Sequence, residues 1–150
     1  MSTRSTQKMM AGLDLISSTY DRIRHDAMSE ATAYGSRRLT VQQHFALEAV
    51  QELVKRGQAQ GASLNDLVKY MHMRASAASL MVENLVGRGL VERTRSMDDR
   101  RAICVTLTEE GVKALKRGTK ALNKRVEMLS EKLTPEEEEQ LLAIIAKICN

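Results

Sequence analysis

Apolar residues recur every three or four positions along most of the chain, and this spacing predicts a mainly helical protein. The stripe nearest the N-terminus runs through Met9, Leu13, Ile16, Tyr20, Ile23, Ala27, Ala31 and Tyr34. Its steps alternate mostly between four and three residues, which gives a heptad pattern with a narrow apolar seam. We therefore expect one long helix that packs along another long helix rather than into a globular core.

Two further helices are predicted near the C-terminus. Thr108 is a suitable N-cap residue, and the acidic Glu109 and Glu110 follow it where the helix dipole favours anions. The seam of this helix consists of Val112, Leu115, Thr119, Leu122, Val126, Leu129 and Leu133. The last helix begins at Thr134 and Pro135 and has a capping-box glutamate. Its apolar residues are Leu141, Leu142, Ile144, Ile145 and Ile148. Three helices with this much apolar surface indicate a homodimer.

Shorter helices are predicted in the middle of the chain. Thr40 and Gln43 have the spacing of a capping box, and apolar residues follow at helical spacing until Arg56. The next segment, residues 57–62, has the composition of a loop. Ser63 then provides a second N-cap signal, and a short helix follows it.

After a turn of a few residues, another helix is predicted to end at Gly87 and Gly89, and it has small polar residues near its start. Its expected apolar face consists of Leu80, Met81, Leu85 and Val86. Two short helices joined by a tight turn are typical of a helix-turn-helix. Residues 90–95 and 102–107 then have the character of strands, and the charged segment 96–101 joins them as a hairpin loop. The predicted fold is therefore mainly α with a small β-hairpin wing.

Positive charge is concentrated in the middle of the chain. The formal net charge is +4. Residues 1–35 and 102–150 are each neutral, whereas residues 36–101 carry eleven basic and seven acidic groups. A localised basic surface attracts polyanions, which makes nucleic acid the first partner to consider. On charge alone, a solvated surface with chance asymmetry explains the pattern equally well.

No set of residues indicates catalysis, a cofactor or a metal site. His25, His44 and His72 fall on three different predicted elements, and no motif links them to a nucleophile. The two cysteines, Cys104 and Cys149, lack metal-ligand spacing. We expect no enzyme activity and no cofactor. We interpret Cys104 as a packing thiol and Cys149 as an incidental one, with a redox role as the alternative. The absence of a signal-like start or a long apolar run predicts a cytoplasmic protein without a membrane span.

The segment from Leu85 to Gly111, LVGRGLVERTRSMDDRRAICVTLTEEG, resembles the signature of the MarR family of bacterial transcription regulators. Gly-Leu-Val follows the predicted recognition helix, and Asp99 and Arg101 occupy the Asp-x-Arg positions of the wing. The pair Leu39-Thr40 also fits the second helix of the family. The resemblance implies a winged helix-turn-helix in which Arg101 reaches the minor groove and Asp99 orients its guanidinium. The alternative is that this loop is simply a soluble hairpin tip.

The resemblance also implies a DNA-contacting set. Its members are Arg74, Ser76, Ala77, Ser79, Arg95, Arg100 and Arg101. Two positions depart from the family: Leu80 stands where many relatives carry a basic residue, and Arg74 stands at the usual place of a serine-like N-cap. Direct base readout is therefore expected to be limited, because neither serine nor alanine gives the bidentate contact of arginine or asparagine.

We interpret the chain as one intertwined domain. Residues 1–35 with 108–150 are expected to form a helical dimerisation region, and residues 36–107 a winged helix-turn-helix lobe. The expected function is a sequence-specific regulator of double-stranded DNA, a homodimeric repressor on a pseudo-palindromic operator, released by a small aromatic or anionic effector. A winged-helix module for protein interaction without DNA binding is the alternative.

Overall fold

The computed structural model describes residues 3–31, 39–57, 60–95 and 103–149. Over these residues the chain forms six helices and three short strands. In order they are α1 (Thr3–Ala31), α2 (Val41–Lys55), β1 (Ala62–Ser63), α3 (Leu64–Met71), α4 (Ala75–Gly87), β2 (Val91–Arg95), β3 (Ile103–Leu107), α5 (Glu109–Ser130) and α6 (Pro135–Cys149). The prediction of a mainly helical fold with a small β wing is confirmed.

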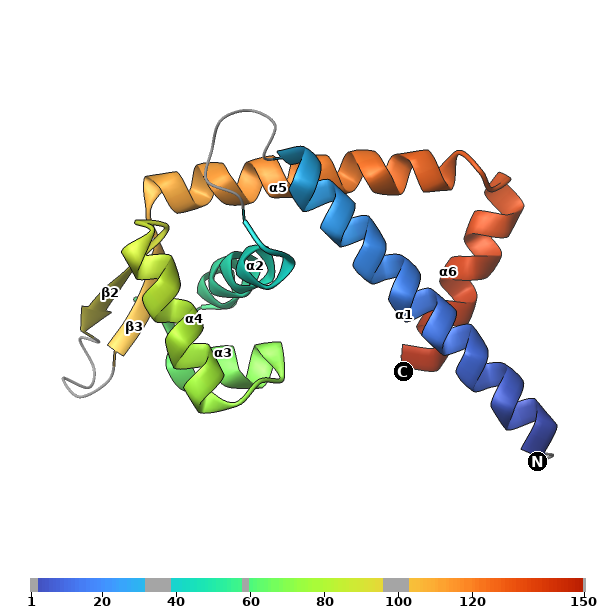
Figure 1. Ribbon diagram of the computed structural model, residues 1–150, viewed down its shortest axis with the longest axis horizontal. Helices are drawn as coiled ribbons and strands as arrows, with labels where there is room; N and C mark the ends of the chain where they lie inside the picture. Colours follow the sequence, from blue (N-terminus) through green and yellow to red (C-terminus); the bar gives the residue numbers. More distant parts are fainter. Residues whose placement is uncertain (1–2, 32–38, 58–59, 96–102, 150) are drawn as a thin grey trace.

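Helix α5 connects the two halves of the molecule (Figure 1). At its N-terminal end lie α2, α3, α4 and the small sheet, which together form the winged lobe. The C-terminal end of α1 lies against the middle of α5, and α6 follows the far end of α5; both helices extend away from the winged lobe. Among the described helices, none is both long and apolar enough to cross a membrane.

The core lies in the winged lobe and extends to the C-terminal part of α1. Its largest fully buried apolar side chains come from α2, α3, α4 and both long strands: Leu47, Val50, Leu67, Leu85, Val91 and Val105. Each of these elements contributes one apolar face, as expected for helices that pack around a small sheet. The winged lobe is therefore a rigid support for the surface of α4.

The helix starts predicted from sequence are confirmed by their caps. Thr40 Oγ1 accepts a hydrogen bond from the Gln43 backbone N–H at 3.1 Å, and the Gln43 side chain accepts one from the Thr40 N–H at 3.0 Å. At the starts of α3 and α5, the hydroxyls of Ser63 and Thr108 accept hydrogen bonds from the backbone N–H groups of Asp66 and Gly111. Cap signals are reliable because they depend on four consecutive residues and on no distant contact.

Strand β1 was not predicted, since residues 57–62 were expected to be a loop throughout. Ala62 and Ser63 pair antiparallel with Val105 and Cys104, which places β3 between β1 and β2. Gly61 makes this approach possible. Its φ is +115°, and a Cβ there would lie 2.9 Å from the carbonyl oxygen of Val105. A two-residue strand has no periodicity, so the sequence gives no signal for it.

The expected apolar face of α4 is only half correct. Leu85 is buried and Met81 is partly buried, but Leu80 is 68% exposed and Val86 is 37% exposed. The helix instead buries Ala78, Val82 and Leu85, which have the i, i+4, i+7 spacing of one face. The prediction gave too little weight to alanine, whose small side chain lets α4 lie close to the core.

The inner face of α5 also differs from the predicted seam. The structure buries Gly111, Ala114, Leu115 and Gly118, whereas the predicted seam residue Val126 is 51% exposed. A Cβ on Gly118 would collide with the Cδ2 and Nε2 atoms of His44 on α2. Glycine therefore sets how closely α5 approaches α2, which a search for large apolar residues does not detect.

Next to this contact, a buried polar cluster joins α1 to α2. Arg24 of α1 donates hydrogen bonds to Glu48 Oε2 at 2.9 Å and to the Tyr20 hydroxyl at 2.7 Å. Arg24 Nη2 lies 3.4 Å from Nδ1 of the fully buried His44. Burial lowers the pKa of His44, so its ring is neutral and can accept from the guanidinium.

Replacing Gly118 with alanine tests the close approach of α5 to α2. Alanine favours helices over glycine by about 1 kcal/mol, but here its methyl group would collide with the His44 ring. We expect Gly118→Ala to lower the free energy of unfolding by about 1–3 kcal/mol, as overpacked cores do. The measurement is urea unfolding followed by circular dichroism.

Gly87→Ala is the matched control, because a Cβ at Gly87 would have no neighbour within 4 Å. Its stability should equal that of the wild type or exceed it slightly. A stable Gly118→Ala variant would contradict the described contact.

Candidate nucleic-acid interface

The turn between α3 and α4 fixes the orientation of α4. His72, at the C-cap of α3, adopts the left-handed conformation with φ 51° and ψ 43°. The backbone N–H of Met73 bonds back to the Val68 carbonyl at 3.2 Å, which closes the end of α3. Arg74 is extended and starts α4. A tight turn between two short helices is the geometry of a helix-turn-helix.

The start of α4 presents the side chains that the sequence predicted for DNA contact. Arg74, Ser76 and Ala77 are exposed, and Ser79 is half-buried. Figure 1 places α4 on the outside of the winged lobe, beside β2 and β3. These residues therefore share one accessible surface, although Ser79 lies nearer the core than the other three.

Arg74 is an unusual N-cap. Its side chain makes no capping hydrogen bond, unlike Thr40, Ser63 and Thr108 at the starts of α2, α3 and α5. A cation at this position also opposes the positive end of the helix dipole. Arg74 thus leaves α4 less stable than serine would, while it places a guanidinium at the leading end of the helix.

The wing strand β2 adds two arginines to this surface. Val91 is buried at the base of β2, while Arg93 and Arg95 are exposed further along the same face of the strand. The predicted contact residues Arg100 and Arg101, and the orienting residue Asp99, lie outside the described residues. Of the predicted wing residues, Arg95 is therefore the one whose position the structure describes.

The sequence prediction omitted Arg93. Its Nη2 lies 3.8 Å from Glu83 Oε1 of α4, so it connects the wing strand to the recognition helix. The period of two along a strand would have found it, since Arg93 and Arg95 are two residues apart. Arg93 is exposed and lies beside Glu83, in the second half of α4.

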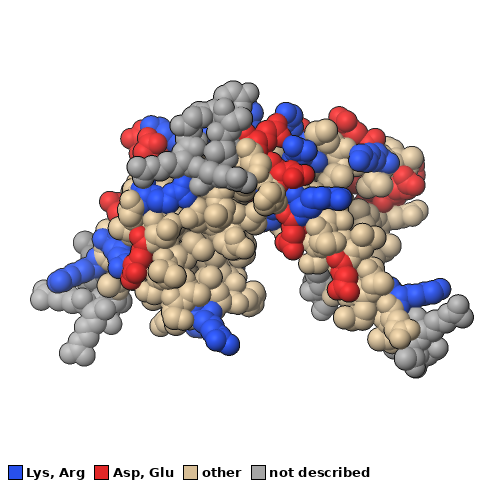
Figure 2. All heavy atoms as spheres, in the orientation of Figure 1, with Lys and Arg blue, Asp and Glu red and all other residues tan. Residues whose placement is uncertain are grey.

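Charge is distributed differently over the two halves. Figure 2 shows basic and acidic side chains mixed along α5, and basic side chains projecting at the wing and at the junction of α3 and α4. Several basic residues of α5 are paired: Lys124 and Arg125 both contact Glu30 of α1, at 2.7 and 3.1 Å. Among the described residues, the winged lobe carries seven basic and five acidic groups, and the rest of the predicted excess lies outside the described residues.

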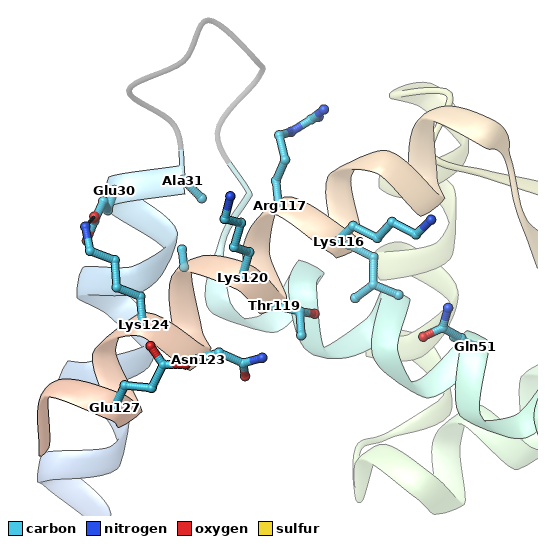
Figure 3. A pocket seen from close by; sticks show the side chains of 12 residues that line it. Glu30, Ala31, Gln51, Lys116, Arg117, Thr119, Lys120, Asn123, Lys124 and Glu127 are labelled. Atoms are coloured by element: carbon cyan, nitrogen blue, oxygen red, sulfur yellow. Dashed lines mark hydrogen bonds and ion pairs between the residues drawn. The ribbon is translucent and has the colours of Figure 1, made fainter. Parts of the chain in front are cut away.

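A cavity of about 1010 Å³ lies away from this surface, where α5 meets the ends of α1 and α2. Its lining includes the basic residues Lys116, Arg117, Lys120 and Lys124 and the acidic residues Glu30 and Glu127. Figure 3 shows that Arg117, Lys116 and Lys120 point in different directions rather than toward one point. The cavity is open to the surface, and its lining is mainly apolar in area despite these charged residues. It adjoins the contact between α1 and α5.

Within the described part of the chain, no group of three or more His, Cys, Asp or Glu residues is placed to hold a metal ion. The three histidines lie on different elements and in different environments. His25 is exposed on α1, His44 is buried in α2, and His72 lies in the turn between α3 and α4. Cys104 is buried in β3. Of the predicted site residues that the structure describes, Arg74, Ser76, Ala77 and Ser79 lie together at the start of α4, and Arg95 lies on β2 of the same lobe.

Comparison with known sequences points to one family. The model of the MarR family matches residues 39–103. An uncharacterized HTH-type transcriptional regulator of Bacillus subtilis, YwhA, is 33% identical over 86 residues. This aligned segment covers 57% of the present chain and 62% of that relative. Residues 39–103, which the family model matches, contain the helix-turn-helix and most of the wing.

Comparison with solved structures extends the fold over the whole chain. A cysteine-to-serine variant of MarR from E. coli, in complex with operator DNA, is 20% identical with a TM-score of 0.75, covering 95% of this chain and 94% of that one. MepR from S. aureus, in a DNA complex, is 21% identical with a TM-score of 0.69, covering 99% and 97%. Both likenesses show the winged helix-turn-helix fold with terminal helices.

The unsatisfied N-cap of α4 yields a stability prediction. We expect Arg74→Ser to raise the free energy of unfolding by about 1 kcal/mol, because serine caps the helix and the unfavourable charge is removed. Urea unfolding measures the change. Arg117→Ser, an equal charge change in the middle of exposed α5, should give no gain. Equal effects in both variants would mean that net charge, not capping, controls the result.

Proposed function

We propose, on the basis of the MarR family model that matches residues 39–103, that the protein is a sequence-specific regulator of transcription that binds double-stranded DNA. We propose further that it acts as a repressor. The observation that carries the proposal is the exposed start of α4, led by Arg74, on the same lobe as the exposed arginines of β2. The operator complexes of MarR and MepR, which share this fold, support it.

In this proposal α4 enters the major groove with Arg74 at its leading end. Ser76, Ala77 and Ser79 follow within two turns, where they contact base edges or thymine methyl groups. The arginines of the wing, Arg95, Arg100 and Arg101, approach the adjacent minor groove, whose narrow form attracts guanidinium groups. Asp99 orients Arg101. Arg74 stabilises the start of α4 less than a capping residue would, and this choice is explained if its guanidinium binds phosphate or a base.

The terminal helices provide the support for dimerisation. Residues 135–148 of α6 and 5–18 of α1 are exposed throughout in the single chain. They include large apolar side chains such as Ile16, Leu142 and Ile144, which are 58%, 60% and 57% exposed. We propose that residues 1–35 and 108–150 form the dimerisation region and residues 36–107 the DNA-binding lobe. Two lobes about 34 Å apart would then meet successive major grooves of a pseudo-palindrome.

Arg101→Ala tests the DNA-binding proposal. Fluorescence anisotropy compares the protein on DNA from upstream of its own gene with scrambled DNA, across a salt series. We expect wild type to prefer the upstream DNA, and Arg101→Ala to lose about 5- to 150-fold in affinity with a flatter salt slope. The control is Arg117→Ala, which removes an equal charge from the face of α5 that points away from α2 (Figure 3).

Two results would redirect the proposal. Weak binding to both DNAs would favour the alternative, a winged-helix module for protein interaction. Equal losses in Arg101→Ala and Arg117→Ala would mean that the wing contributes to binding only through general electrostatic attraction.

Benzoate, a small aromatic anion, added to the same titration tests release by an effector. The cavity where α5 meets α1 and α2 has basic residues in its lining, which supports an anionic effector. An unchanged DNA affinity in the presence of benzoate would contradict release by such an effector.

A charged residue on α6 tests dimerisation. Light scattering coupled to gel filtration should give twice the mass of one chain for wild type. Ile144→Lys should give the mass of one chain, because a buried lysine without a partner is strongly unfavourable at an apolar interface. Ala143→Lys, an equal charge change on the opposite face of the same helix, should remain a dimer. A monomeric wild type would contradict the proposed arrangement directly.

A further inference from the structure

Leu80 is an exposed leucine on the outer side of α4. Its side chain is 68% exposed, as much as any large apolar residue of the described chain. The helix buries Ala78, Val82 and Leu85. At 100° per residue, Leu80 lies about 160° around the helix from this buried face. It therefore projects directly away from the core, in the middle of the helix that the winged lobe presents.

The neighbours of Leu80 on this outer ridge are small or already engaged. Ser76, one turn before it, is exposed and short. Glu83, one turn after it, lies 3.8 Å from Arg93 of β2. Asn84 accepts a hydrogen bond from the Gln43 side chain of α2 at 2.7 Å. Leu80 thus extends furthest from the helix at a place where the flanking polar groups are turned toward the winged lobe.

The surroundings favour DNA over an apolar protein surface as the partner of this side chain. A protein-docking patch requires several contiguous apolar residues. The other exposed large apolar residue of α4, Val86, is six residues away and about 120° around the helix from Leu80. Leu80 is instead bordered by Ser76 and Glu83, and the same lobe carries Arg74 and Arg95 at its surface. A single apolar side chain within a polar, basic surface matches a groove of DNA.

We propose that Leu80 is a specificity-determining residue that packs against the C5-methyl group of thymine in each half-site. The inference rests on the proposed DNA-binding function. In the major groove the thymine methyl is the one apolar group on the base edges, and all other edge groups donate or accept hydrogen bonds. A leucine over those polar edges would remove water without replacing its hydrogen bonds. The short Ser76 and Ala77 allow α4 to approach closely enough for this contact.

The test uses DNA in which thymine is replaced by deoxyuridine, which lacks only the methyl group. Each thymine of the preferred upstream fragment is replaced in turn, symmetrically in both half-sites, and affinity is measured by anisotropy at fixed salt. At one symmetric position we expect wild type to lose about fourfold per half-site, or about fifteenfold in total, the value of one methyl-sized group removed from water.

Three variants assign the effect to Leu80. Leu80→Ala should bind the thymine and deoxyuridine fragments with equal affinity, because its side chain no longer reaches the methyl. Leu80→Met keeps an apolar side chain of similar volume and should retain the discrimination. Val86→Ala, which shortens an exposed apolar residue on a different face of α4, should also retain it. Circular dichroism and urea unfolding verify that each variant is folded.

The outcomes separate this inference from the proposed function. If wild type prefers the upstream DNA but no deoxyuridine substitution weakens it, Leu80 does not read thymine while DNA binding stands. The same conclusion follows if Leu80→Ala still discriminates between the two fragments. If wild type shows no preference for any upstream DNA, the proposed function itself fails. The deoxyuridine series on wild type needs no mutation, so a misfolded variant would not prevent the test.

Discussion

The arrangement of the molecule depends on the close contact between α5 and α2 at Gly118 and His44. Because Gly118 has no side chain, the His44 ring fits against the backbone of α5. His44 is also near the Arg24 guanidinium, which donates hydrogen bonds to Glu48 and Tyr20. Helices α1, α2 and α5 thus meet through one neutral imidazole and one buried cation. Removing either partner would leave a buried polar group without its hydrogen bonds, which is the costly way to break such a cluster.

The proposed DNA surface has a different physical character from this junction. Most of its residues are exposed. Arg74 reduces the stability of α4 because it does not cap the helix, and Leu80 gives up burial by leaving a large apolar side chain in water. Sites of binding commonly depart from the choices that would stabilise a fold best. The serines and alanine beside them limit hydrogen-bonded readout. Recognition by this helix is therefore expected to depend on shape, apolar contact and the wing more than on bidentate pairs.

Much of the fold was predictable because short stretches of consecutive residues determine where its helices begin. The caps at Thr40, Ser63 and Thr108 and the heptad spacing of α1 each involve a few consecutive residues, and all agree with the structure. The errors arose where small residues decide packing. The absence of a side chain at Gly61 allows β1 to pair with β3, and its absence at Gly118 allows α5 to approach α2 closely. Neither glycine contributes to an apolar pattern in the sequence. For the site, spacing located Arg74 and Arg95 but missed Arg93, whose pairing with Glu83 joins segments ten residues apart.

The length of α5 gives the fold a mechanical property. Its 22 residues span about 33 Å, and one end is fixed in the winged lobe while the other carries the helices proposed to join two copies. A rigid rod of this length that tilts by about 5° moves its far end by about 3 Å. That displacement is comparable to the contact distance between a side chain and a base edge. The separation of two recognition helices would then be controlled by an angle at the junction rather than by any residue that touches the groove.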